Sequence, residues 1–283
     1  MKRTVFSALA LVLFFNIDVR AQQELVSDYF KRVPLEEAHV VTGESAKSEF
    51  NPTSIKVMVW NIKKTQELPW QTEFLSFGRG RELFLLQEVY PNELFINTLA
   101  VLSKFRWDMG ISFRYRLMND LPTGTMIGSK VTPLEVIVKH SPDLEPMTET
   151  PKAMTLARFA VSNRKDDLLV INVHGINFTE FGAFQRQMDQ IKEEVESHTG
   201  PVLVAGDFNT RTKERTDYMM NMMKALKLEE VMFKNANQRM VAVFTPYYLD
   251  FAFVRGLKVT NAEVLGRAKG SDHKPMTLDL SLK

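Results

Sequence analysis

The chain has 283 residues, of which 45% are hydrophobic and 25% are charged, the composition of an ordinary globular protein. It contains no cysteine. This excludes a disulfide scaffold, a thiolate zinc site, a cysteine nucleophile and a lipid-modified amino-terminal cysteine. A chain of this length forms one large domain or two small ones, and it can bury enough surface to need no covalent cross-link.

The first 21 residues have the pattern of a signal peptide. Lys2 and Arg3 precede an apolar run over 5–15, which is too short to span a bilayer as a helix. Val19 and Ala21 have the spacing of a signal-peptidase site with cleavage after Ala21. The pattern predicts export to the periplasm or the medium, with no stable membrane anchor. A buried amino-terminal helix is the alternative.

Removal of residues 1–21 would leave the mature chain neutral. The whole chain has a formal net charge of +2, and loss of the segment takes the basic residues from 36 to 33 and the acidic residues from 34 to 33. A polyanionic partner would therefore have to be held by local basic patches, because the overall field would not attract it.

Residues 22–54 are polar and mixed, and we expect them to form a loosely ordered lead-in. From residue 55 onward, short apolar runs bounded by turn residues predict strands. These runs lie at 55–60, 82–88, 134–139, 155–161, 168–174, 201–207, 249–254 and 274–282. The runs at 55–60, 168–174 and 201–207 are almost continuously apolar, which is typical of inner strands covered on both faces.

Three stretches between the strands have helical periodicity, at 91–102, 180–198 and 216–228. The longest carries an apolar stripe at spacings of three and four residues, with charges on the opposite side. Many strands with few helices predict an α/β sandwich of two sheets with helices outside. We expect one catalytic domain over 55–283, and a monomer.

Polar side chains lie at the ends of several predicted strands. They are Asn61, Glu88, His174 with Asn177, Asp207 with Asn209, Asp250, and Asp272 with His273. Loops beyond strand ends build the site in α/β folds. Each residue alone could be a turn residue, half of a surface ion pair or a structural histidine. Together they predict one site, because several buried carboxylates are costly without a cation.

The segments WN, LLQE, NVHGIN, AGDFNTR, LDFAFV and GSDH resemble the endonuclease/exonuclease/phosphatase superfamily in order and spacing. These are Mg²⁺-dependent phosphodiesterases that include DNase I-like and abasic-site nucleases. The resemblance extends over about residues 55–283, and GDFN and SDH together are its most specific parts. It implies a four-layer α-β-β-α sandwich of two packed mixed sheets, with the site at one end, and hydrolysis by in-line attack of water.

The resemblance implies a metal site. Asn61, Glu88 and Asp272 resemble the family's metal ligands, and their oxygens suit a hard ion such as Mg²⁺, with Mn²⁺ or Ca²⁺ as alternatives. Some family members place an acidic residue two positions after the WN asparagine, where this chain has Lys63. This departure leaves the choice between one and two ions open.

The resemblance also implies the catalytic residues. Asp207 resembles the residue that orients or deprotonates the attacking water, and Asn209 the donor that steadies the charge on phosphorus. His273 resembles the catalytic histidine, and Asp250 the carboxylate that fixes its tautomer. His174 corresponds to a phosphate-facing residue that either donates to a non-bridging oxygen or protonates the leaving group.

Two further residues are expected to bind the substrate phosphate. Asn177 matches a phosphate-side asparagine of the family, three positions after His174. Lys64 could contact the phosphate as a point charge, although a solvated lysine pair with Lys63 is equally compatible with the sequence. The sequence leaves open whether Lys152 and Arg158 face the site.

A nuclease acting on DNA or RNA is the first hypothesis for the substrate. Basic and aromatic residues at 104–116, with Arg79 and Arg81, could form a nucleic-acid patch, and the aromatics of 244–248 precede Asp250. A solvated face and ordinary packing are the alternatives.

Two other hypotheses remain open. A phosphoesterase of the same chemistry could act on sphingomyelin or a phosphoinositide, and it would need an exposed apolar hairpin, which is not evident in the sequence. A binding module with a retired site is the third possibility. The intact set of acidic, amide and histidine residues argues against it.

Overall fold

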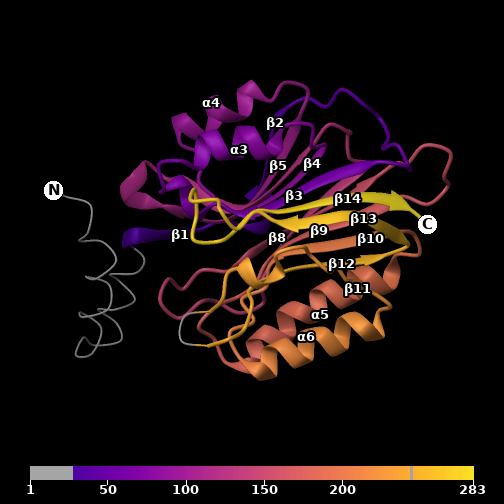
Figure 1. The fold of residues 1–283 in the computed structure, drawn as a ribbon. Helices are drawn as coiled ribbons and strands as arrows, with labels where there is room; N and C mark the ends of the chain where they lie inside the picture. The colour runs from indigo at the N-terminus through magenta and orange to yellow at the C-terminus, as the bar shows by residue number, and fades with distance from the viewer. Residues whose placement is uncertain (1–27, 243–244) are drawn as a thin grey trace.

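The computed structural model describes residues 28–242 and 245–283, so the predicted signal peptide lies outside the described residues. Within these residues, two mixed β-sheets pack face to face, with helices on the outer face of each (Figure 1). This arrangement confirms the predicted four-layer α-β-β-α sandwich. None of the described helices is both long and apolar enough to cross a membrane.

The first sheet carries eight of the described strands. Their order is β1-β5-β6-β4-β3-β14-β13, with β2 also paired to β5. They are β1 (Phe30–Arg32), β2 (His39–Gly43), β3 (Ile55–Asn61), β4 (Leu83–Val89), β5 (Arg106–Tyr115), β6 (Leu121–Ser129), β13 (Leu257–Val264) and β14 (Met276–Leu282). Helices α3 (Trp70–Gly78) and α4 (Glu93–Val101) cover its outer face (Figure 1).

The second sheet carries six described strands in the order β11-β12-β10-β9-β8-β7. They are β7 (Glu135–His140), β8 (Ala153–Phe159), β9 (Leu168–His174), β10 (Val202–Asp207), β11 (Glu229–Glu230) and β12 (Asp250–Arg255). Helices α5 (Phe181–Ser197) and α6 (Lys213–Ala225) cover its outer face (Figure 1). Short 3-10 turns occur at Leu35–Glu37, Lys63–Thr65, Arg116–Met118 and Ala236–Gln238.

The alternation of side chains along the strands explains the layers. In β3, Ile55, Val57 and Val59 belong to the apolar cluster between the sheets. Met58 and Trp60 point the other way, into the cluster under α3 and α4. A third apolar cluster joins the second sheet to α5 and α6. The strands β9 and β10 are buried along their whole length, which confirms the prediction that they are inner strands.

Several elements differ from the sequence-based expectation. The strands β1 and β2 lie in the segment expected to be loosely ordered, and both pair with β5. Polar exposed strands of this kind lack the apolar runs by which strands were recognised. The neighbouring β5 and β6 were also missed, because glycines interrupt their pattern. A Cβ on Gly124 would lie 1.9 Å from the carbonyl oxygen of Gly110, so the close approach of these strands requires glycine.

One helix begins earlier than its apolar pattern suggested. Helix α6 starts at Lys213, and the Thr212 side chain accepts a hydrogen bond from the backbone N–H of Arg215. Thr212 is thus the N-cap, and it lies four residues before the predicted start at residue 216.

Candidate active site

The structure brings the polar strand ends of the second sheet together with the loop before β14. This strand runs toward the carboxyl terminus at the right of Figure 1, so the loop with Asp272 and His273 lies at the opposite end of the sheets. At the end of β10, Asp207 pairs in register with His174 of β9 on one side and with Asp250 of β12 on the other. The prediction that these segments meet at one rim is therefore consistent with the strand register.

The first sheet contributes Asn61 and Glu88 to the same rim. Asn61 ends β3 opposite Gln87 of β4, and Glu88 is the next residue. A hydrogen bond of 3.0 Å from Asn61 Nδ2 to Asp207 Oδ2 joins the two sheets at the site. Below it, Gln87 Nε2 donates to Asn172 Oδ1 at 2.6 Å. Polar contacts between the sheets therefore hold the two halves of the site in register.

His273 and Asp250 form a buried pair. His273 Nδ1 lies 2.9 and 3.0 Å from the two carboxylate oxygens of Asp250. Burial acts to lower the pKa of His273, but the carboxylates of Asp250 and Asp207 outweigh it and raise the pKa to about 10. The ring is therefore cationic at neutral pH, with Nδ1–H on Asp250 and Nε2 3.8 Å from Asp207 Oδ2.

Asp207 is held at both carboxylate oxygens. Asn61 donates to Oδ2, and the backbone N–H of Asn209 donates to Oδ1 at 3.0 Å. Burial raises the pKa of Asp207 to about 6, against the opposing effect of the His273 cation. A carboxylate with a pKa near the working pH suits a general base.

Glu88 lies on a kink of β4. The register with β6 shifts between Leu86 and Val89, and Glu88 has a φ of 52°. A bulge of this kind re-aims a side chain. Burial acts to raise the pKa of Glu88, but the ammonium groups of Lys64 and Lys152 outweigh it, so the pKa lies below the ordinary value. Glu88 is therefore a fixed negative charge at the rim.

The predicted metal ligands differ in how far their oxygen atoms are already paired with other groups. Glu88 Oε2 forms an ion pair with Lys64, so an ammonium group neutralises the carboxylate that a metal ion would bind. Asn61 Oδ1 accepts from the backbone N–H of Lys63 at 3.1 Å, and its Nδ2 faces Glu88 Oε1 at 3.4 Å. Asp272 is half-exposed and lies 3.5 Å from Lys63 Nζ. Carboxylate and amide oxygens are donors that a hard divalent ion accepts, but in this structure the Glu88 carboxylate faces Lys64 and the amide nitrogen of Asn61.

A second group could also hold a cation. Asp207, Asp250 and His273 each offer a ligand atom, and these atoms lie within 4.8 Å of one another. Two carboxylates and an imidazole are donors that divalent ions accept. In this structure, however, Nδ1 of His273 is hydrogen-bonded to Asp250. This favours a protonated Nδ1 over an Nδ1 that coordinates a metal ion.

His174 and its basic neighbour Lys152 also belong to the rim. His174 is buried, with Nε2 3.8 Å from Asp207 Oδ2. Burial, followed by the charge of Lys152, places the pKa of His174 well below its ordinary value, so the ring is neutral. Lys152 also lowers the pKa of Glu88, and burial together with the Glu88 charge raises the pKa of Tyr115. Lys152, whose orientation was left open, and Tyr115, expected only as part of a nucleic-acid patch, are therefore neighbours of the site.

The loops that carry the two predicted asparagines are fixed by hydrogen bonds, mainly from an arginine. The amide nitrogen of Asn209 donates to the carbonyl of Gly175 at 2.9 Å. The buried guanidinium of Arg215 donates to the carbonyls of Ile176 and Asn209 at 2.9 and 3.3 Å. In the same loop, the backbone N–H of Asn177 donates to Glu145 Oε1 at 2.8 Å. Arg215 therefore ties the loop after β9 to the loop after β10.

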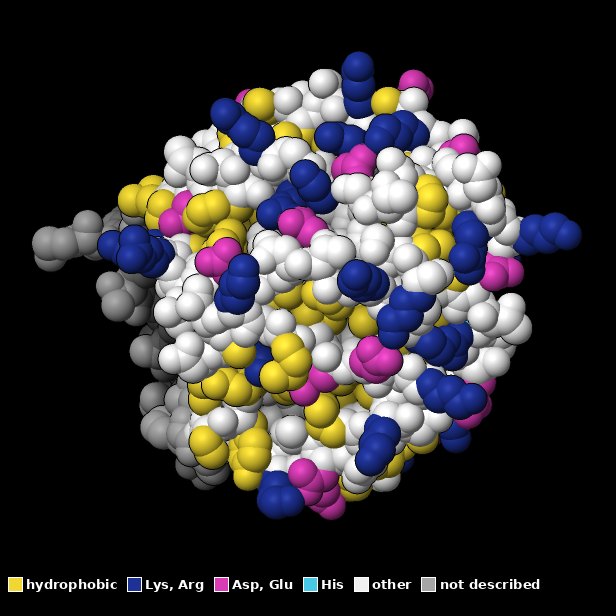
Figure 2. Space-filling view, turned by 45° about the vertical axis from the view of Figure 1, so that its right-hand side comes forward, with side chains coloured by type: hydrophobic (Ala, Val, Ile, Leu, Met, Phe, Trp, Pro, Cys, Tyr) yellow, Lys and Arg dark blue, Asp and Glu magenta, His cyan; other side chains and the backbone are white. Residues whose placement is uncertain are grey.

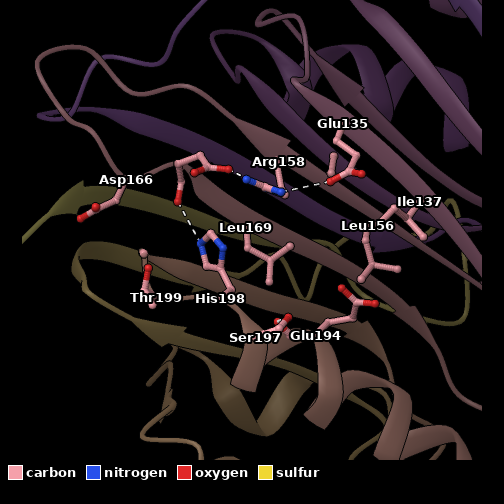
Figure 3. A pocket seen from close by; sticks show the side chains of 13 residues that line it. Glu135, Ile137, Leu156, Arg158, Asp166, Leu169, Glu194, Ser197, His198 and Thr199 are labelled. Carbon is pink, nitrogen blue, oxygen red and sulfur yellow. Dashed lines mark hydrogen bonds and ion pairs between the residues drawn. The ribbon is translucent and has the colours of Figure 1, made fainter.

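Arg158, whose orientation was open, lies away from this site. It is at the other end of β8, where it forms ion pairs with Glu135 and Asp167 at 3.2 and 2.5 Å (Figure 3). These residues line a polar pocket, and His198 Nε2 lies 2.9 Å from the Asp167 carbonyl oxygen. The arginine is committed to this pocket and is not available to the catalytic rim.

The basic and aromatic segment at 104–116 does not form one patch. Phe105 and Trp107 are buried in the cluster under α3 and α4, and Arg106 pairs with Asp108 at 2.9 Å. Only the distal end of β5, near Tyr115, approaches the site. On the face shown in Figure 2, Lys and Arg side chains are interspersed with Asp and Glu. Residues 104–116 therefore do not form the extended basic stripe that their sequence suggested.

The sandwich and its rim of carboxylates, amides and a histidine–aspartate pair place the protein in the phosphoester hydrolase class. The Endonuclease/Exonuclease/phosphatase family matches residues 58–273. The chain belongs to this family, which confirms the resemblance found in the sequence.

Several known proteins resemble this chain in sequence or in structure. A UPF0294 protein of Klebsiella pneumoniae is 30% identical over 228 residues, covering 80% of this chain and 82% of that protein. An endonuclease/exonuclease/phosphatase from Beutenbergia cavernae superimposes with a TM-score of 0.64 at 15% identity, over 81% of this chain and 72% of that one. The human Nocturnin catalytic domain, solved with bound sulfate, gives 0.58 at 17% identity, over 89% and 100%. At these identities the two solved structures support the fold alone.

Proposed function

We propose that this protein is an exported, metal-dependent phosphodiesterase that cuts DNA or RNA by in-line attack of water. One observation carries the proposal: a cationic His273, fixed by Asp250, faces a carboxylate of raised pKa, Asp207, in one buried cluster. A proton donor and a proton acceptor side by side are the groups that hydrolysis of a phosphodiester requires.

The protons are assigned by the hydrogen bonds. Asp207 Oδ1 and Oδ2 are both held by donors, so the carboxylate is oriented to take a proton from the attacking water. His273 holds a proton on Nε2 for the phosphate or the leaving oxygen, because Asp250 fixes the other proton on Nδ1. The neutral His174 would donate one hydrogen bond to a phosphate oxygen. None of these groups forms a covalent bond to phosphorus.

The proposed metal site is built around Glu88. A bound Mg²⁺, or Mn²⁺ or Ca²⁺ in its place, would stabilise the charge on the phosphate oxygens. Asn61 and Asp272 would add oxygen donors, and Asn177 would bind the phosphate. Since Lys64 pairs with Glu88, binding of an ion requires this ammonium to move, and it would then be able to contact the phosphate as predicted.

The test is hydrolysis of plasmid DNA and of RNA by the purified mature chain with Mg²⁺, beside the variants Asp207→Ala and His273→Ala. Cleavage by the wild type that both variants lose would support the nuclease. Release of choline phosphate from sphingomyelin, or of inositol phosphates, without nucleic-acid cleavage would replace it with a lipid phosphoesterase. Absence of turnover on all of these substrates would favour a binding module.

Export and oligomeric state are separate parts of the proposal. The signal pattern of residues 1–21 supports export, and the size of the single domain supports a monomer. Amino-terminal sequencing of protein from the extracellular or periplasmic fraction should begin at Gln22. Protein found only inside the cell with Met1 intact would contradict export. Light scattering on the same preparation would test the monomer.

A further inference from the structure

A large aromatic side chain stands exposed at the catalytic rim. Phe178 follows Asn177 in the loop after β9, and 65% of its surface is accessible. It lies four residues after His174, so the two are at most about 14 Å apart along the chain. Single exposed apolar residues are common on protein surfaces, and exposure alone would not distinguish this one.

The backbone of Phe178 is held in a conformation that bulky residues avoid. Its φ is 52°, in the left-handed region, where a Cβ crowds the following carbonyl. Its N–H donates to the Asn177 side-chain oxygen at 2.9 Å. Such outliers persist only when the surroundings impose them, and they cluster at functional sites. The loop therefore fixes the backbone of Phe178, although its exposed ring contributes little to packing.

Arg211 supports the ring. Its guanidinium carbon lies 5.0 Å from the centre of the Phe178 ring, and its Nε donates to Asn177 Oδ1 at 2.6 Å. Asn177 Oδ1 thus accepts from both the Phe178 backbone and the Arg211 side chain, and Asn177 is the residue proposed to bind the phosphate. A cation above a ring restricts its motion and leaves the other face for a planar partner.

From this geometry we propose that Phe178, backed by Arg211, is a stacking platform for the nucleobase beside the scissile phosphate. The inference rests on the proposed nuclease function and names its substrate class: a single-stranded or unpaired nucleic acid, since a base within a duplex already stacks on its neighbours. Phe178 is a specificity-determining residue, and it takes no part in proton transfer.

The experiment compares two single-stranded oligonucleotides with one cleavable phosphodiester. One carries a base next to this bond, and the other carries an abasic tetrahydrofuran residue there. The ratio of kcat/KM on the two is measured with Mg²⁺ for the wild type, Phe178→Leu and Phe178→Tyr. Leu134→Ala is the control, because Leu134 is 61% exposed and its N–H donates to the carbonyl of Arg158, at the other end of the sheet from the rim. Bis(p-nitrophenyl) phosphate reports phosphodiesterase activity without a nucleobase.

We expect Phe178→Leu to lower the ratio at least about 5-fold, the scale of one base–aromatic stack, while Phe178→Tyr and Leu134→Ala keep it. An equal ratio in Phe178→Leu, with nucleic acid still cleaved, would overturn the platform and leave the nuclease intact. Hydrolysis of bis(p-nitrophenyl) phosphate without cleavage of any oligonucleotide would overturn both. A loss of thermal stability in Phe178→Leu with an unchanged ratio would assign the ring to packing instead.

Discussion

Both carboxylate oxygens of Asp250 lie within hydrogen-bond distance of a single atom, Nδ1 of His273. The bond fixes the tautomer, and the buried carboxylate stabilises the cation. His273→Ala should therefore lower kcat on a phosphodiester at least about 10²-fold, the usual scale for a general acid–base group. Asp250→Asn should lose activity in the same way while the chain stays folded. Steady-state kinetics with circular dichroism would check both, and a near-normal rate in His273→Ala would exclude it as a catalyst.

The pKa shifts predict a broad pH optimum for kcat/KM. Burial raises the pKa of Asp207 to about 6, so this carboxyl gains a proton and stops acting as a base as the pH falls through that value. The carboxylates around His273 raise its pKa to about 10, so the ring loses its proton only at high pH. Activity should fall on the acid side near pH 6 and on the alkaline side near pH 10. A profile whose alkaline limb lies at the ordinary histidine pKa would contradict the ion pair.

Strand endings made much of the site predictable. His174, Asp207 and Asp250 each lie at a strand boundary that was recognisable in the sequence, and strand register then places them side by side. Lys152 was not assigned, because its approach to Glu88 and His174 depends on how loops pack across the sheets. Local sequence patterns locate the ends of a strand, but they do not show which residue a loop side chain contacts.

The same reasoning explains the missed elements of the fold. Asp108 is the third residue of β5 and is buried beside Arg106 and His39. This acidic residue and a glycine two positions later interrupt the apolar alternation of the strand. Helix α3 was missed because its nine residues carry only Trp70, Phe74 and Gly78 on the buried side. Short elements are stabilised mainly by tertiary contacts, which the local sequence does not contain.

Removal of divalent metal should abolish activity. Glu88 stays negative because its pKa lies below the ordinary value, and the oxygen donors near it suit Mg²⁺. EDTA treatment followed by gel filtration should give inactive protein, and added Mg²⁺ should restore turnover. Glu88→Gln should require much more Mg²⁺ for half-maximal rate, and Glu93→Gln, on α4, is the matched control. Undiminished turnover after chelation would rule out the metal role of Glu88.

Stability should depend on pH through Asp108. Burial acts to raise its pKa, but hydrogen bonds from His39 and Arg106 outweigh burial and lower it. A depressed native pKa stabilises the fold above the unfolded-state pKa of about 3.9, and this contribution is lost as the pH falls through the native value. Asp108→Asn should lower the free energy of unfolding at pH 7 by about 1–3 kcal/mol, and the difference from the wild type should shrink in acid. Urea unfolding at several pH values would check it. The half-exposed Asp120→Asn should change little, and a constant difference across pH would contradict the assignment.

Arg215 should contribute both to the stability of the fold and to turnover. Its guanidinium is 5% exposed and donates to the carbonyls of Ile176 and Asn209 and to both oxygens of Thr179. Arg215→Met keeps the apolar stem but leaves these acceptors unpaired, so the free energy of unfolding should fall by about 2–4 kcal/mol. Since the same acceptors belong to the loops that carry Asn177 and Asn209, kcat/KM should fall as well, even at temperatures where the variant is fully folded. Arg215→Lys cannot reach both loops with one planar group and should recover only part of either loss.

The control for this arginine is Arg186. It is half-exposed and pairs with Asp143 and Glu180 on the surface of α5, so Arg186→Met should leave both unfolding and turnover near the wild-type values. Chemical denaturation and kinetics on the four proteins would separate the two contributions. A variant Arg215→Met that is destabilised yet turns over normally when folded would limit Arg215 to a structural role, because the loops would then hold Asn177 and Asn209 without it.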